Sequence, residues 1–350
     1  MIDHSKSSSR RRLSFVSATA LVVAARIAAY HVASALVAAA LIGAACAWGF
    51  PDAEAQEPTP PPEAKAPATA VTKAAPAPAA SGTSGKTPEM LLVPAGEFQM
   101  GAAVDDKYSL GDDKPLRRVI LKAFRISRFE VTNAQYRSFL AATATQHPKS
   151  CSPFEPSGTQ HAPEGPTWSD PEWNDATKPV VSVTWFDAYA YCAWDGKRLP
   201  SEAEWEKAAR GTDARVFPWG PEIMKDSPVA NIADEAAKRE YPAWRVGEGY
   251  DDGFVHTSPV GSFPNGASPY GVEDMAGNVW EWVADWYSPA PYGEPGISNP
   301  TGPAVGDWRV LRGGSWDSTL HFIRATARHH NIPGFRSKSF GIRCAQDVAE

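Results

Sequence analysis

The chain has 350 residues, of which 43% are hydrophobic, and its 34 Lys and Arg against 40 Asp and Glu give a formal net charge of −6. This length and composition allow one large domain or two ordinary ones, and they exclude a wholly disordered chain. Outside the N-terminus the sequence has no cluster of Lys and Arg, so it lacks the basic surface that a nucleic-acid partner requires.

The first 55 residues have the pattern of an export signal peptide. Arg10-Arg11-Arg12 precedes apolar stretches at 13–25 and 32–50, and small residues lead up to a cleavage site after Ala55. We therefore expect an exported protein, periplasmic or secreted. The second apolar stretch has 19 residues, near the minimum for a bilayer span, so an uncleaved membrane anchor is the alternative. Ser9 to Leu13 also resembles the twin-arginine signal of bacterial proteins that are exported folded.

Residues 56–87 are expected to form an extended, disordered linker. Of these 32 residues, 9 are Ala and 7 are Pro, so the segment cannot bury enough apolar surface to offset its chain entropy. Residues 88–350 then form a single folded domain. Twelve of the 13 Trp lie after residue 160, among many Gly and Pro, which predicts a loop-rich body packed by large aromatic side chains.

Strand patterns dominate the start of this domain. Leu91 to Gly101 is typical of two short strands about a Pro-Ala-Gly turn, and 118–131 alternates well enough to be another strand. Beyond residue 212 only short apolar runs stand between Gly, Pro, Asn and Asp. The second half is therefore expected to consist of loops and brief strands.

Three helices are expected between the first strands and residue 212. The first begins at Thr132, which has the capping-box spacing with Gln135. The second is capped by Thr184 or Ser182 and ends before Gly196. The third has Ser201 as its N-cap, with Glu204 as the reciprocal partner, and ends near Gly211.

Several long motifs follow one another through the domain. The most specific are MLLVPAG from Met90, PVVSVTWFDAYAYCAWDGKRLPSEAEWEKAARG from Pro179, SPYGVEDMAGNVWEWVADWY from Ser268, RGGSW from Arg312 and FGIRC from Phe340. In this order they resemble the sulfatase-modifying-factor family, whose best-known members are the formylglycine-generating enzymes. The resemblance implies an α+β fold, irregular and loop-rich, related to C-type lectins.

Ser318 departs from this family at its most important position. The resemblance implies two catalytic cysteines after the Gly-Gly-Ser motif, which bind copper(I) as thiolates and activate oxygen to oxidise a substrate cysteine. Here Ser318 stands at the first of these positions, and no residue from 316 to 343 is Cys. Because a hydroxyl is a hard and weakly acidic ligand, copper and the family's oxidation are not expected.

The remaining cysteines match the family in part. The resemblance implies a disulfide between Cys192 and Cys344, which an exported protein can keep. A second family pair would fall at Ala209 and Ala325, so that bridge is absent as a unit. If Cys46 is removed with the signal, Cys151 is an odd thiol, and we expect it to be free.

Calcium is the metal that the resemblance favours, as a structural ion between loops. Oxygen-rich loops with carboxylates and backbone carbonyls supply the ligands that calcium prefers. One site would use Asp274, Gly277, Val279 and Glu281, and the other Asn231, Ile232, Asp252 and Phe254. No Cys and His spacing indicates zinc.

The pocket of the family is expected to persist without its thiols. Trp280 and Ser315 match residues that line it, and Ser318 and Arg328 are further candidate catalytic positions. Asp317, Ser318 and His321 contain the residue types of a nucleophilic triad, although a gap of three residues does not establish its geometry.

Two other polar features, a pair of arginines and a pair of histidines, have two interpretations each. Arg324 and Arg328 either form structural ion pairs or receive a carboxylate-bearing ligand. The pair His329-His330 is expected on a surface loop rather than at a metal.

Two classes of function remain open from the sequence. One is an exported maturation factor or noncanonical oxidoreductase that acts on a peptide-like substrate. A cysteine-lacking periplasmic member of the family, involved in pyoverdine siderophore maturation, is an example of such a role. The other is a non-catalytic, lectin-like module that binds a peptide, a glycan or a partner protein.

Overall fold

The computed structural model describes residues 89–106, 108–109, 111–143, 161, 166–222, 227–290 and 296–348. The chain divides into two units after Lys73, and every described residue belongs to the second. The expected signal peptide, the linker, Cys46 and Cys151 lie outside these residues. Within the described ranges, no helix has both the length and the apolar character needed to cross a membrane.

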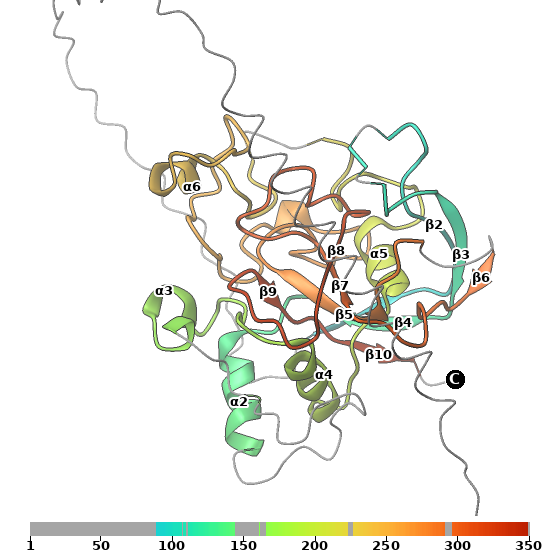
Figure 1. Ribbon diagram of the computed structural model, residues 1–350, viewed down its shortest axis with the longest axis horizontal. Coiled ribbons are helices and arrows are strands. Elements are labelled where there is room, and N and C mark those ends of the chain that lie inside the picture. Colours follow the sequence, from blue (N-terminus) through green and yellow to red (C-terminus); the bar gives the residue numbers. More distant parts are fainter. Residues whose placement is uncertain are drawn as a thin grey trace, which may run out of the picture. The chain divides into compact units, whose positions relative to one another are not determined.

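The described strands form three small sheets (Figure 1). The first contains β1 (Met90–Val93), β4 (Phe124–Ser127) and β10 (Ala345–Asp347), and the second β2 (Gly96–Met100), β3 (Arg117–Leu121) and β6 (Ile297–Ser298). The third has the order β8 (Arg328–Asn331), β7 (Arg309–Arg312), β5 (Trp280–Trp286) and β9 (Phe340–Gly341). Short strands in mixed sheets, with few helices, confirm the loop-rich α+β class.

The strand expected over 118–131 is wrong as a single element. The chain forms β3 and β4, with Lys122 and Ala123 between them, and the two strands pair in different sheets. β1 and β2 confirm the two short strands expected about the Pro-Ala-Gly turn, and they belong to different sheets, because β1 pairs with β4 and β2 with β3. The alternating pattern identified extended backbone but not the point where the chain moves from one sheet to the next.

The three expected helices are confirmed. Those are α2 (Asn133–Thr143), α4 (Trp185–Trp194) and α5 (Glu202–Arg210), and the described residues also contain the short helices α3 (Pro171–Asn174), α6 (Glu235–Glu240), η1 (Pro166–Trp168) and η2 (Pro264–Gly266). Thr184 and Ser201 are N-caps with complete capping boxes. Gly211 follows α5 with φ 69°, a conformation that favours glycine.

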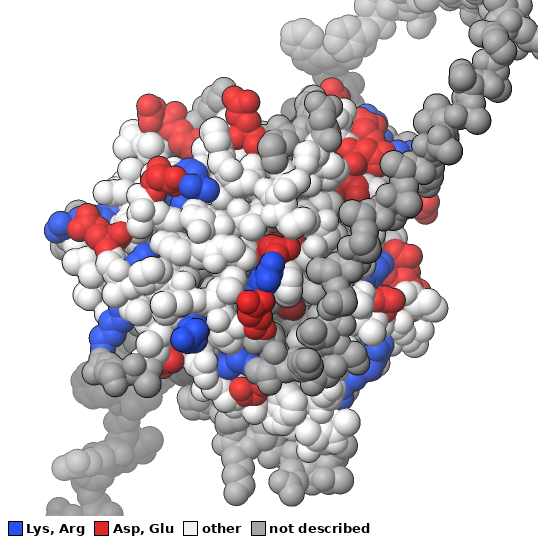
Figure 2. All heavy atoms as spheres, turned by 180° about the vertical axis from the view of Figure 1, so that it is seen from behind, with Lys and Arg blue, Asp and Glu red and all other residues white. Residues whose placement is uncertain are grey.

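Helix α5 packs against strands of both the second and the third sheet. It packs against β2, β3, β5 and β7 (Figure 1), and Trp205 on α5 is fully buried. Burial of such a side chain stabilises the fold by about 1.5–3 kcal/mol. The face in Figure 2 carries acidic and basic side chains in small mixed groups between wide uncharged areas, with no basic stripe.

Candidate functional site

The segment 313–318, here called the pocket loop, follows the end of β7. Gly313 and Gly314 have φ values of 103° and 78° and turn the chain sharply. A Cβ atom on Gly314 would stand 2.6 Å from the side chain of Ile323, so this turn requires glycine. The turn places Ser315 inside the molecule, with no exposed surface.

Four polar side chains meet in the pocket loop and beside it. The Ser315 hydroxyl donates to Oδ1 of Asp317, and the Ser339 hydroxyl donates to Oδ2 at 2.7 Å. The Ser315 backbone N–H donates to Oγ of Ser318 at 3.0 Å, and the two hydroxyl oxygens are also 3.0 Å apart. The three serines are buried, whereas Asp317 is exposed. We call these four residues the hydroxyl cluster.

The hydroxyl cluster does not fit copper(I). Its donors are oxygen atoms, and the only cysteines among the described residues are joined in a disulfide. Copper(I) selects soft sulfur ligands. The hydroxyl cluster therefore offers no thiolate to hold the copper(I) that the resemblance implies.

Trp280 and His329 lie on neighbouring parts of the third sheet. Their ring centroids are 5.2 Å apart, and the ring of Phe340 is 5.7 Å from His329. Burial and, to a smaller extent, His330 lower the pKa of His329 to about 4, and Asp317 and Asp112 act in the opposite direction. His329 is therefore a neutral imidazole near pH 7.

Arg328 and His330 face the other side of β8. Arg328 forms a bidentate pair with the buried Glu202, at 2.6 and 3.0 Å, and its guanidinium lies 4.9 Å from the ring of Tyr287. His330 stacks on the same ring at 3.7 Å. The structure thus places Arg328 in an ion pair, and it places the two histidines on a strand instead of the expected surface loop.

Two further candidate residues, Arg324 and His321, also interact with groups outside the hydroxyl cluster. Arg324 pairs with the buried Asp113 at 3.0 Å, so the ion-pair interpretation describes both arginines. The ring of His321 lies 5.2 Å from Tyr108, and its carbonyl accepts from Arg324. The structure does not bring His321 to Ser318 as a triad would require.

Trp316 connects the pocket loop with a group of aromatic rings that the motifs did not reveal. Its ring lies 5.4 Å from Trp173, 5.8 Å from Trp244 and 4.8 Å from His256. The ammonium of Lys338 lies 4.8 Å above the ring of Trp173. The signal in the sequence was only the high number of Trp residues.

The first loop expected to bind calcium contains an unsatisfied oxygen. Asn231 is buried, and its Oδ1 has no hydrogen-bond partner, while its Nδ2 donates to the His256 carbonyl at 2.8 Å. The Asp252 carboxylate accepts from the amides of Ile232 and Phe254, at 2.9 and 2.8 Å. Burial and the neighbouring Asp234 raise the pKa of Asp252 to about 8. An unpaired buried acceptor beside a buried carboxylate fits a hard cation.

The second loop contains more negative charge than its one arginine balances. Burial raises the pKa of Asp274 to about 7, and burial together with Asp274 raises that of Glu130. Glu281 accepts from Arg343 at 2.7 Å and from Trp205 at 2.6 Å. A cation would complement this excess. Glu130 was not identified from the sequence as a member of this site.

Backbone hydrogen bonds join both candidate calcium loops to the pocket loop. Gly277 donates to the Gly313 carbonyl and Trp316 to the Asn278 carbonyl, each at 2.9 Å. Ala233 donates to the Ser318 carbonyl at 3.0 Å. Within the described ranges, no three His, Cys, Asp or Glu side chains form a metal site, so a cation here would depend on backbone and amide oxygens as well.

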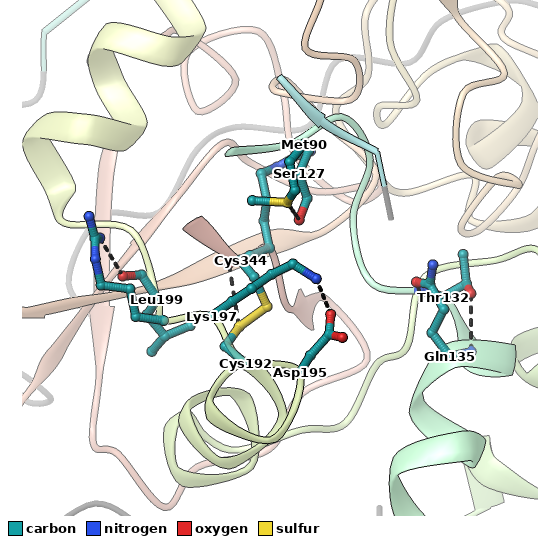
Figure 3. The surroundings of a disulfide bond; sticks show 11 residues. Met90, Ser127, Thr132, Gln135, Cys192, Asp195, Lys197, Leu199 and Cys344 are labelled. Carbon is teal, nitrogen blue, oxygen red and sulfur yellow. Dashed lines mark hydrogen bonds and ion pairs between the residues drawn. A yellow bond between two sulfur atoms is a disulfide. The ribbon is translucent and has the colours of Figure 1, made fainter. Parts of the chain in front are cut away.

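The expected disulfide is confirmed. Cys192 on α4 and Cys344 before β10 are bonded, with Cα atoms 5.6 Å apart, and both are fully buried (Figure 3). The Cys344 carbonyl accepts from Ser127 at 2.9 Å, which ties the bridge to β4. Ala209 and Ala325, at the positions of the second family pair, are both buried in one hydrophobic cluster.

Comparisons with known proteins agree with this architecture. Residues 75–348 match the model of the sulfatase-modifying factor enzyme 1-like domain. A formylglycine-generating enzyme of Streptomyces coelicolor is 38% identical over 288 residues, 73% of this chain and 88% of that protein. Hercynine oxygenase of Mycolicibacterium smegmatis is 36% identical over 293 residues, 77% of this chain and 63% of that protein. The structure of PvdO from Pseudomonas aeruginosa is similar with a TM-score of 0.56 and 31% identity, covering 75% of this chain and 95% of that one.

Proposed function

The chain belongs to the sulfatase-modifying factor family, and on this basis we propose that it is an exported maturation factor for a peptide-like substrate. The relatives named as formylglycine-generating enzymes and as hercynine oxygenase place oxidation within the range of the family. The structure of PvdO supports membership of the same family, because 95% of that chain is covered at 31% identity. Export is proposed from the N-terminal sequence pattern.

The hydroxyl cluster is the observation that carries this proposal. Ser315 lies in the pocket loop and Trp280 on β5, and Ser318 has a hydroxyl at the position where the resemblance implies a thiolate. A module that had lost all chemistry would not need three buried serine hydroxyls bonded around one carboxylate, because burial of polar groups is costly. The proposed reaction therefore uses the pocket without two copper-bound thiolates.

Calcium has a structural part in this proposal. Asn231, with its unpaired Oδ1, and Asp252 would hold one ion, and Asp274 with the carbonyl groups of Gly277 and Val279 would hold the other. Calcium would neutralise buried carboxylates and fix loops. Backbone hydrogen bonds from these loops would then hold Gly313, Trp316 and Ser318 in place.

A comparison of cell extracts tests the maturation role. Peptides and peptide-like metabolites would be compared by mass spectrometry in cells that lack the protein and in cells that express the native chain or the Asp317→Ala variant. We expect a product that depends on the native chain and is lost with the variant. Identical profiles in all three cultures would contradict the proposal.

A second experiment tests the exclusion of the family's copper reaction. The purified protein is incubated with a Cys-X-Pro-X-Arg peptide, copper(I) and oxygen. We expect no mass loss to formylglycine, because two thiolates are needed and the pocket offers hydroxyls. Formylglycine formation would show that this chain performs the reaction by other ligands.

The alternative function, a non-catalytic binding module, is favoured by the aromatic rings around Trp316. Trp244 and His256 are partly exposed and can contact a glycan or peptide, whereas Trp173 is buried in a hydrophobic cluster with Trp316 and lies under the ammonium of Lys338. This alternative predicts a ligand that is retained unchanged. Binding that survives Asp317→Ala but is lost with Trp244→Ala, without any product, would favour it.

A further inference from the structure

The hydrogen bonds of the hydroxyl cluster have a definite direction. The ionised carboxylate of Asp317 can only accept, so the Ser315 hydroxyl uses its single proton in the bond to Oδ1. The Ser315 oxygen therefore has no proton left for Ser318. In the 3.0 Å contact between the two hydroxyl oxygens, Ser318 must be the donor. Protons are thus aligned from Ser318 through Ser315 to Asp317.

A second contact orients the Ser318 hydroxyl. The backbone N–H of Ser315 donates to Oγ of Ser318 with a distance of 3.0 Å. This bond occupies one acceptor site of the oxygen and directs the Ser318 proton toward Ser315. The other half of the arrangement is fixed as well, because Ser339 holds the free oxygen of Asp317 at 2.7 Å.

We propose that Ser318 is a nucleophile, activated by Asp317 through Ser315, and that it reacts with carboxylic esters or similarly activated acyl groups. The Ser318 oxygen would bond to the acyl carbon while the bond from that carbon to the leaving oxygen breaks. The Ser318 proton moves to Ser315, and the Ser315 proton moves to Asp317. Asp317 then returns its proton to the leaving alcohol, and water releases the acyl group in a second step.

The positions of these residues are compatible with a reaction at the surface. Asp317 is exposed, and Ser318 retains 6% of its accessible surface, so the cluster lies close to the molecular surface. The neutral imidazole of His329, on whose pKa Asp317 acts, is not part of this relay. The inference does not depend on the maturation role, because it concerns the reactivity of one hydroxyl.

A fluorophosphonate probe tests this inference on the purified full chain. We expect one adduct per molecule, located by peptide mass spectrometry at Ser318, and a burst of p-nitrophenol from p-nitrophenyl acetate. Asp317→Asn should lower the labelling rate by about 10²–10⁴-fold, the usual contribution of general-base catalysis. The variant should remain folded, as a thermal melt would show. Ser315→Ala should have a similar effect because it breaks the relay.

Matched controls separate activation from general damage. Asp307→Asn and Ser298→Ala change exposed residues of the same types and should leave labelling unchanged. Ser318→Cys tests access, since a thiol at this position should react with iodoacetamide in the folded protein. Three results would overturn the proposal: no adduct at Ser318, a labelling rate that Asp317→Asn leaves unchanged, or a Ser318→Cys variant that iodoacetamide does not reach.

Discussion

Gly277 lies so close to Asn231 that a Cβ atom on Gly277 would stand 2.0 Å from the Asn231 carbonyl oxygen. The two residues belong to the two candidate calcium loops, and the amide of Asn278 donates to this same oxygen at 2.9 Å. The absence of a side chain at Gly277 therefore allows the loops to join.

Gly277→Ala should be strongly destabilising. The new methyl group would overlap backbone atoms, and the φ of 83° adds strain, so we expect a loss of about 3 kcal/mol or more. Chemical denaturation measures this loss. Gly111→Ala is the control, because its φ of 103° is also positive but nothing lies within 4 Å, and only about 1–2 kcal/mol is expected. Equal losses would mean that the close approach to Asn231 is unimportant.

Arg343→Met should leave buried negative charge without its partner. Arg343 and Glu281 are almost completely buried, and their ion pair measures 2.7 Å. Removal of one member of such a pair costs about 3–5 kcal/mol. The exposed pair of Arg118 and Glu97 offers the matched control, Arg118→Met, for which we expect less than about 1 kcal/mol. The unfolding midpoints of both variants, compared with that of the native chain, measure these two losses of stability.

The disulfide should contribute about 2–5 kcal/mol to stability. It closes a segment of 152 residues, and Cys192 and Cys344 are both inaccessible to solvent. The double variant Cys192→Ala, Cys344→Ala measures this contribution in comparison with the native chain. Thiol labelling of the denatured, unreduced protein provides the second measurement. Modification of more than two of the four cysteines would show that this bridge does not form.

Removal of calcium should lower the melting temperature. A ligand at 100 times its Kd stabilises a protein by about 2.7 kcal/mol, so chelation should reverse a shift of this order. Asn231→Leu removes the unpaired Oδ1 and should abolish the part of the melting-temperature shift that comes from the first loop. Asn265→Leu changes an exposed asparagine and should retain it. If chelation has no effect on the native chain, neither loop binds calcium.

Acid should destabilise the fold through His329. Its pKa falls from an ordinary value of about 6.5 to about 4 on folding, so the unfolded chain takes up the proton first. The stability that this group contributes is complete above pH 6.5 and is lost progressively toward pH 4, by roughly 3 kcal/mol. His330, Asp317 and Asp112 are the charged or titratable groups that act on it.

His329→Gln tests this dependence. The difference in unfolding free energy between pH 7 and pH 5 should be smaller in this variant than in the native chain. His321→Gln, at an exposed position, should behave like the native chain. A His329→Gln variant with an unchanged pH dependence would contradict the assignment.

The sequence was sufficient for the family, the helix starts and the disulfide. The capping boxes at Thr184 and Ser201 are local patterns, because both partners lie within four residues of each other. The division of 118–131 into two strands depends on partners far along the chain, such as Ala345 for Ile126. Local alternation contains no information about such partners.

The site was only partly predictable for the same reason. The motifs identified Ser315, Ser318 and Trp280, but Ser339 reaches Asp317 from 22 residues away and Glu130 reaches Asn278 from 148 residues away. For Arg328 a structural ion pair and a ligand contact both remained open, because its partner, Glu202, is fixed only by tertiary packing. Side chains meet across sequence distances that spacing alone does not reveal.

The bond between Cys192 and Cys344 also makes a covalent ring of the chain between them. This ring includes β5, β7, the pocket loop and both candidate calcium loops, while β1 to β4 precede it in the chain and β10 follows it. A protease that cuts one surface turn within the ring would therefore leave both fragments attached to each other. Such a nicked molecule would migrate as two pieces on a gel only after a reductant is added.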